Sequence, residues 1–255
     1  MESPTGMPGH MLLSLRGIAK SFGAVRALDG VDLDIGPAEV LGLMGDNGAG
    51  KSTLTKIVAG NFPPTEGQIA LGGTAMVFDR PAAARDAGIE VMYQDLAIAE
   101  NLTASANIFL GREMTRSFGP LRFLDHSGMN KRSAELFREL KSETRSDDLV
   151  KQMSGGQRQA VAIARTRLAK AKLVLMDEPT AAISVRQVAE VLDLIRRLRD
   201  GGTAVMLISH RMPDVFTVCD RIAVLRRGRK VADKPVTATS PEEITGLITG
   251  AIETG

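Results

Sequence analysis

Hydrophobic and polar positions along this chain follow two periods, and these predict strands that alternate with helices. Short apolar runs predict strands at residues 11–15, 31–35, 39–44, 89–93, 173–176 and 204–208, and two more within 68–77. Apolar residues at helical spacing predict helices at 51–59, 129–140, 157–168 and 184–199. This order indicates an α/β fold with a mostly parallel sheet covered on both faces.

The middle of the chain has a different pattern of apolar and polar residues. Between residues 95 and 157 the strand pattern fades and helical spacing takes over. We therefore expect a helical subdomain at 95–157, inserted into a core made of 11–94 and 158–233. Residues 234–255 form a short C-terminal tail to which the sequence assigns no function.

Composition places few further limits on the protein. Its 255 residues are 44% hydrophobic, which is ample for a core, and the net charge of +2 does not favour nucleic acid as a partner. The single cysteine, Cys219, is expected to be buried and reduced. No apolar run approaches the about 20 residues that cross a bilayer, and residues 1–10 lack the pattern of a signal peptide. If the protein works at a membrane, another chain must supply the span.

A glycine-rich loop carries the strongest chemical signal. It consists of Gly45, Asp46, Asn47, Gly48, Ala49, Gly50, Lys51, Ser52 and Thr53. Glycines let several N–H groups point at one phosphate, and a helix that begins at the loop adds the positive end of its dipole. Lys51 would reach the β and γ phosphates, the Ser52 hydroxyl would bind Mg²⁺, and Thr53 would lie nearby. Because the strand–turn–helix context is right, an ordinary glycine turn is the weaker interpretation, and we expect MgATP binding.

An acidic pair follows the apolar strand at 173–176. Asp177 would hold the magnesium shell, and Glu178 would act as general base on the attacking water. Alone, such a pair is usually a solvated strand end. Beside a phosphate loop it predicts hydrolysis of ATP.

Two further features would complete such a site. Ser154, Gly155, Gly156 and Gln157 stand at the start of a predicted helix, where they would form a second anion-binding nest or, alternatively, an ordinary helix cap. His210 follows the strand at 204–208, so a γ-phosphate contact is expected, although lone histidines are more often structural. The other histidines, His10 and His126, are expected to be solvated.

The order of these motifs resembles the ATPase subunit of ABC transporters, over nearly the whole chain from about Leu12 to about Val231. The resemblance implies a P-loop NTPase core with an N-terminal antiparallel β subdomain and the inserted helical subdomain. It implies that Gln94 senses the γ phosphate and Mg²⁺ and faces the membrane partner. Phe22 would stack on adenine, the alternative being a core phenylalanine.

The resemblance also implies partners. The Ser154–Gln157 motif of one copy would cover the ATP held by the loop of a second copy, in a head-to-tail dimer. Transmembrane permease subunits and, indirectly, a solute-binding protein would be the other partners, at the cytoplasmic face of the inner membrane.

A narrower similarity concerns the cargo. Residues 45–48, 93–96 and 107–113 resemble ATPases of monosaccharide importers of the ribose, xylose and fructose type, in their single-cassette form. Two positions depart from the wider family pattern. Ser184 stands where most members have an aspartate that couples the two sites, and Met153 replaces a leucine.

Three other interpretations stay open. The first is an importer ATPase for a non-sugar cargo, the second is a non-transport ATPase of the same fold, and the third is a regulatory module that binds ATP without cleaving it. Glu178 and His210 argue against the last. The absence of a coiled-coil insertion, of a second cassette and of strong basic charge argues against the second.

Overall fold

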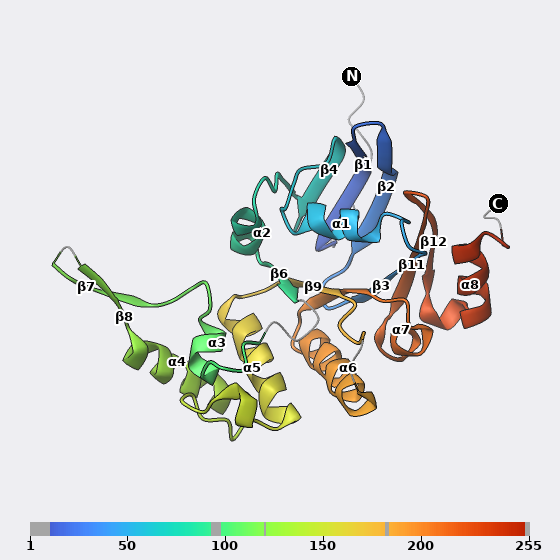
Figure 1. Cartoon of the computed structure of the whole chain (residues 1–255). Coiled ribbons are helices and arrows are strands. Elements are labelled where there is room, and N and C mark those ends of the chain that lie inside the picture. Colours follow the sequence, from blue (N-terminus) through green and yellow to red (C-terminus); the bar gives the residue numbers. More distant parts are fainter. Residues whose placement is uncertain (1–10, 93–97, 120, 182–183, 253–255) are drawn as a thin grey trace.

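Two large β-sheets and a group of helices make up this chain (Figure 1). The computed structural model describes residues 11–92, 98–119, 121–181 and 184–252. Within this part, no helix is both long enough and apolar enough to span a bilayer.

The first sheet is antiparallel and lies near the N-terminus. Its strand order is β2-β1-β4-β5. The strands are β1 (Leu13–Phe22), β2 (Val25–Ile35), β4 (Glu66–Leu71) and β5 (Thr74–Met76). Alternate residues of β2, namely Val31, Leu33 and Ile35, are fully buried, so one face of this sheet packs on the core. The expected antiparallel subdomain is confirmed.

The second sheet has the order β12-β11-β3-β10-β9-β6 and is parallel except for β12, which pairs antiparallel with β11. The strands are β3 (Val40–Met44), β6 (Ile89–Met92), β9 (Leu173–Asp177), β10 (Ala204–Ile208), β11 (Arg221–Arg226) and β12 (Arg229–Pro235). Every residue of β3 and β10 is buried, which explains their continuous apolar sequence. The expected mostly parallel core is confirmed.

Separate hydrophobic cores cover the two faces of this sheet. Leu43, Leu175 and Ile208 point to the face that carries α1 (Lys51–Val58) and the antiparallel sheet. Their strand neighbours point to the opposite face, which carries α6 (Val185–Asp200), α7 (Met212–Val218) and α8 (Pro241–Thr249). Figure 1 shows α1 on one side of the sheet and α6 on the other.

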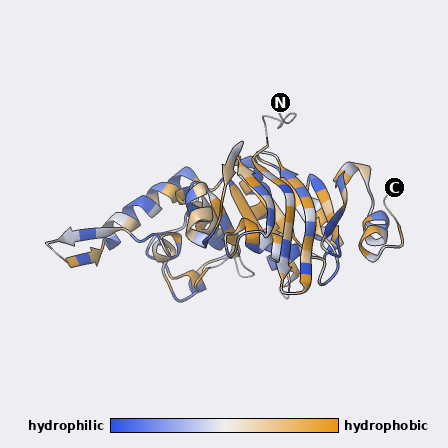
Figure 2. Cartoon of the chain, turned by 90° about the horizontal axis from the view of Figure 1, so that it is seen from above, coloured by the Kyte–Doolittle hydropathy of each residue, from blue (hydrophilic) through white to orange (hydrophobic). Residues whose placement is uncertain are grey.

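A third core lies in the helical region. It joins α3 (Ala104–Ile108), α4 (His126–Glu139) and α5 (Gly155–Leu168), with a 3-10 turn at Val150–Gln152 before α5. The hairpin of β7 (Thr115–Phe118) and β8 (Leu121–Leu124) projects from it, away from the sheets in both views (Figures 1 and 2). Met153, in place of the usual leucine, is buried in this core.

Several elements differ from the sequence expectation. The pattern did not predict the β7–β8 hairpin, α2 (Pro81–Ala87) or the strands β11 and β12. The expected boundary at 157 falls inside α5, which begins at Gly155. The tail beyond residue 234 contains α8, whose Ile244 and Leu247 are buried in the core shared with α6. The proposed subdomain limits stay a prediction.

Cys219 is buried, as expected, and burial raises the pKa of its thiol above the usual range. We predict that the folded chain reacts with a thiol reagent on the order of tenfold or more slowly than the unfolded chain, since the thiolate is the reactive form. Colorimetric thiol titration with and without denaturant measures this difference. Equal rates in the two states would contradict the burial of Cys219.

Candidate active site

The carboxyl ends of three neighbouring strands bring the chemical residues together. In the parallel register, Ile208 of β10 pairs with Leu43 of β3 on one side and with Asp177 of β9 on the other. The loop after β3, His210 after β10 and the acidic pair at the end of β9 therefore share one sheet edge. This is the edge where open α/β sheets bind ligands.

Close packing fixes the shape of the glycine loop. At Gly45, which has φ +152°, a Cβ atom would overlap the carbonyl oxygen of Leu225. At Gly50, with φ +104°, it would lie 2.6 Å from Leu28 Cδ2 and 2.8 Å from the Ala27 carbonyl oxygen. Glycine is therefore required at both positions.

Lys51 is held inside this loop. Its ammonium donates hydrogen bonds to the carbonyls of Gly45 at 2.7 Å and Asp46 at 3.0 Å. Helix α1 begins at Lys51, so the amides of its first turn, including those of Ser52 and Thr53, have no partner inside the helix. The exposed side of the loop therefore presents N–H groups, an ammonium and the Ser52 hydroxyl, a set that suits a phosphate chain.

The turn between β11 and β12 supports the loop from behind. Gly228 donates a hydrogen bond to the Ala49 carbonyl at 3.0 Å and accepts one from Asp29 N–H at 2.8 Å. No local pattern in the sequence predicts this contact. The Arg227-Gly228 pair between two apolar runs was a turn signal, but only the fold shows that the turn meets the loop.

Asp177 and Glu178, the acidic pair, differ in their surroundings. Burial and the neighbouring Glu178 charge raise the pKa of Asp177, while Lys51 and Lys56 oppose the rise. The position of Glu178 is unusual because its backbone has φ +50°, a conformation that non-glycine residues seldom adopt. A hydrogen bond of 2.9 Å from Glu178 N–H to the Ile208 carbonyl fixes this turn.

Glu178 and His210 are direct partners. His210 Nδ1 lies 2.8 Å from Glu178 Oε2, with the Glu178 side chain 24% exposed and the imidazole 67% exposed. Glu178 Oε2 is buried and has no hydrogen-bond partner among the described residues, so the contact brings the two side chains together without a hydrogen bond between them. A partly buried carboxylate in this position can accept a proton from a bound water.

The Ser154 motif forms a helix cap away from the loop. Ser154 Oγ accepts from Gln157 N–H at 3.4 Å, and Gln157 Oε1 accepts from Ser154 N–H at 2.9 Å. At Gly155 a Cβ atom would meet the Glu190 carboxylate of α6, the end of a flexible side chain that can move aside, whereas Gly156 is open. Among the described residues, no hydrogen bond or ion pair joins this motif to the glycine loop.

The other residues singled out in the sequence lie outside the sheet edge described above or outside the described part of the chain. Phe22 is 49% exposed, so the alternative of a core phenylalanine is wrong. Gln94 and His10 lie outside the described residues, and His126 is exposed as expected. Ser184 caps α6, where its hydroxyl accepts from Gln187 N–H at 3.4 Å.

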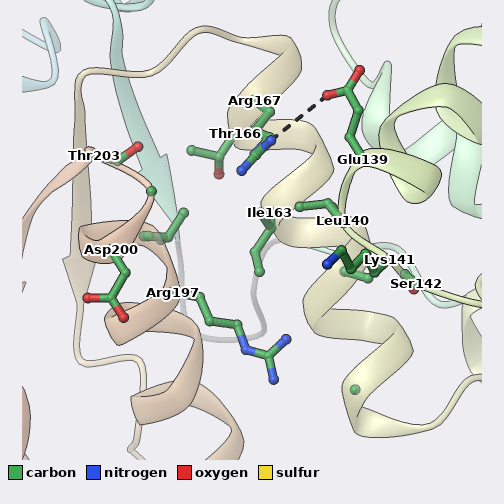
Figure 3. A pocket seen from close by; sticks show the side chains of 14 residues that line it. Glu139, Leu140, Lys141, Ser142, Ile163, Thr166, Arg167, Arg197, Asp200 and Thr203 are labelled. Atoms are coloured by element: carbon green, nitrogen blue, oxygen red, sulfur yellow. Dashed lines mark ion pairs between the residues drawn. The ribbon is translucent and has the colours of Figure 1, made fainter.

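A groove of about 560 Å³ lies apart from the loop, between the ends of α4 and α6 and the side of α5 (Figure 3). Two arginines of its rim are in ion pairs, since Arg167 lies 3.9 Å from Glu139 and Arg197 lies 2.7 Å from Asp193. Among the described residues of the predicted site, only Gly156 lines the groove. The groove is therefore not the centre of the chemistry described above.

Comparison with known proteins gives consistent matches. A family model described as ABC transporter matches residues 28–181. The chain is 46% identical to the xylose/arabinose import ATP-binding protein XylG of Sulfolobus acidocaldarius, over 93% of this chain and 94% of that protein. It is 42% identical to the fructose import ATP-binding protein FrcA of Rhizobium meliloti, over 97% of each. It is 41% identical to the ribose import ATP-binding protein RbsA of Burkholderia pseudomallei, and spans only 47% of that longer chain.

Solved structures share the fold at lower identity. The ADP conformation of MJ1267, an ATP-binding cassette of an ABC transporter, superposes with a TM-score of 0.74 at 24% identity, over 94% of this chain and 95% of that one. The dimeric post-hydrolysis state of the cassette MJ0796 bound to ADP and Pi gives a TM-score of 0.63 at 24% identity, over 88% and 98%.

The packing of the loop predicts different outcomes for two glycine substitutions. Gly45→Ala should lower the free energy of unfolding by about 2–4 kcal/mol, because the methyl group meets a backbone carbonyl. Gly48→Ala is the matched control, since φ is +77° but its Cβ would meet open space, and it should cost only about 1 kcal/mol. Chemical denaturation of the full chain measures both. Equal losses would show that Leu225 does not confine the loop.

Proposed function

This chain belongs to the ABC transporter family and is an ATPase, and we propose that it is the ATP-hydrolysing subunit of a monosaccharide importer. The observation that carries the proposal is the meeting of the glycine loop, the Asp177–Glu178 pair and His210 at one sheet edge. The sugar assignment rests on relatives named for import of xylose/arabinose, fructose and ribose.

The loop would hold the triphosphate of ATP. Amides at the start of α1 would bind phosphate oxygens, and the Lys51 ammonium would move from the carbonyls of Gly45 and Asp46 to the β and γ phosphates. Adenine would stack on the exposed ring of Phe22 at the end of β1.

Magnesium fits the oxygen donors at this edge. The Ser52 hydroxyl and the Asp177 carboxylate are hard ligands, and Gln94 would add an amide oxygen. The described residues contain no cluster of three or more His, Cys, Asp or Glu that could hold a metal alone. Mg²⁺ usually takes only one or two protein ligands beside phosphates and water, so two or three donors suffice. When bound, the ion neutralises charge on the phosphates.

Glu178 and His210 would carry the chemical step. The Glu178 carboxylate accepts a proton from water as the water oxygen forms a bond to the γ phosphorus, and the bond from that phosphorus to the ADP oxygen breaks. Glu178 Oε2 lies beside His210 Nδ1, and the exposed imidazole ring would reach a γ-phosphate oxygen.

A second copy would complete the site. The Ser154 motif caps a helix in the third core, and the glycine loop packs in the first, so one chain keeps them apart. In a head-to-tail pair, Ser154 and the Gly155 and Gly156 amides of one copy would cover the ATP of the other. The dimeric, ADP-bound and Pi-bound state of a cassette with this fold supports the arrangement.

The other partners would be permease subunits contacted near Gln94 and, indirectly, a solute-binding protein. The chain would then sit peripherally at the cytoplasmic face of the inner membrane. Opening after hydrolysis would reset the transporter.

The role of Glu178 gives a separable prediction. Glu178→Gln keeps the size and the hydrogen-bonding oxygen but cannot accept the proton, so ATPase turnover should fall by about 10²–10⁴-fold. ATP should still bind, and the unreacted nucleotide should hold the two copies together. Phosphate release and light scattering with ATP measure the two effects.

The control is Lys51→Ala, which removes the ammonium from the loop and should abolish tight ATP binding and with it the dimer. Turnover at the wild-type rate in Glu178→Gln would show that Glu178 is not the base. Unchanged ATP affinity in Lys51→Ala would contradict the phosphate role of the loop.

The transport role predicts which proteins accompany the chain. Captured by a tag from detergent-solubilised membranes of its native cells, it should bring a polytopic membrane protein, with a solute-binding protein encoded or recovered beside it. Titration of that binding protein with pentoses and hexoses should give saturable binding. Recovery with ribosomes or DNA and no permease would overturn the transport assignment and leave the ATPase chemistry intact.

A further inference from the structure

Phe22 does not stand alone at the end of β1. Its ring meets that of Phe62, in the segment between α1 and β4, with centroids 5.4 Å apart and planes at 90°. The ammonium of Lys20 lies 5.5 Å from the Phe22 centroid and 4.9 Å from the Phe62 centroid. The two rings form an aromatic pair, and the Lys20 ammonium lies beside both of them.

The two rings differ in burial. Phe62 is partly buried and packs against the first core, whereas Phe22 is 49% exposed. A perpendicular contact between aromatic rings is favourable because the positive edge of one meets the negative face of the other. The anchored ring therefore limits the rotation of the exposed one.

The segment that carries Phe62 is itself fastened to β1. Lys20 Nζ donates to the Pro63 carbonyl at 2.7 Å. Thr65 N–H donates to the Ala19 carbonyl at 2.8 Å, and Ser21 N–H donates to Thr65 Oγ1 at 3.2 Å. These three bonds fix the position of Phe62 relative to the strand that ends at Phe22.

We infer that Phe62 is a positioning residue for the nucleotide base, acting through Phe22. The inference rests on the proposed stacking of adenine on Phe22. A ring that is held in place before binding loses less rotational freedom when the base arrives, so affinity rises. Phe62 lies outside the glycine loop, so we expect its effect to be confined to ligands that carry a base.

Stacking also sets the ligand class. Every nucleobase has a flat π face, so stacking on an aromatic ring is tolerant of the identity of the base. We expect the pair to strengthen ATP and GTP binding alike. It should leave magnesium tripolyphosphate, which has no base, unaffected.

The test compares Phe62→Leu with Phe62→Tyr in the full chain, both in the Glu178→Gln background so that nucleotide is not consumed. Leucine keeps apolar packing but removes the ring, and tyrosine keeps the ring. Phe62→Leu should weaken ATP and GTP binding about threefold to tenfold in calorimetric titrations. Tripolyphosphate affinity should not change, and Phe62→Tyr should bind ATP as the parent does.

Two outcomes overturn the inference. Unchanged ATP affinity in Phe62→Leu would show that the ring contact does not assist binding. Equal weakening of ATP and tripolyphosphate would show a general structural role. The variant Phe22→Ala distinguishes a failure of this inference from a failure of the proposed function. If Phe22→Ala binds ATP normally, adenine does not stack on Phe22. If Phe22→Ala binds ATP weakly and Phe62→Leu binds it normally, only the role of Phe62 is wrong.

Discussion

The confinement of the glycine loop between two sheets is the constraint on which the site depends. The loop leaves β3 of the parallel sheet, and its glycines pack on Leu225 of β11 and on Ala27 and Leu28 of the antiparallel sheet. Gly228 then bridges the Ala49 carbonyl and the Asp29 amide. Contacts with both sheets therefore fix the direction of the amides that would face the phosphates. The antiparallel sheet thus supports the loop and also carries Phe22.

Strand order explains why distant residues meet. Asp177 and His210 are separated in sequence by α6 and β10, yet β9 and β10 are parallel neighbours, and β10 also borders β3. The left-handed turn at Glu178 then directs its carboxylate to His210 instead of continuing the strand. Backbone strain at a functional residue persists only where the surroundings over-determine it, and the bond from Glu178 N–H to the Ile208 carbonyl supplies that constraint.

The sequence predicted the parts of this fold whose local pattern and burial agree. The buried strands β3, β9 and β10 and the glycine loop were found because continuous apolar runs end directly in chemical residues. The β7–β8 hairpin was missed because Leu121, Phe123 and Leu124 are exposed, so no alternation of buried and solvated positions marks it. The Gly228 support, the Glu178–His210 contact and the Phe62 ring contact arise from tertiary packing, which no local pattern encodes.

Helix α6 physically connects the two halves of the proposed dimer site. It begins at the Ser184 cap, shortly after the Glu178 turn, and packs along α5, where Gln159 donates to the Glu190 carbonyl and Gly155 fits against the Glu190 carboxylate. Ser184 uses its hydroxyl on its own helix end, as an aspartate cap would, so the position keeps its structural role without the negative charge. In a head-to-tail pair, the base that acts on one ATP precedes α6 and the motif that covers the other caps α5, so the packed pair of helices would connect them. Closure on either nucleotide would move both elements together, so packing would link hydrolysis at the two proposed sites without a charge at residue 184.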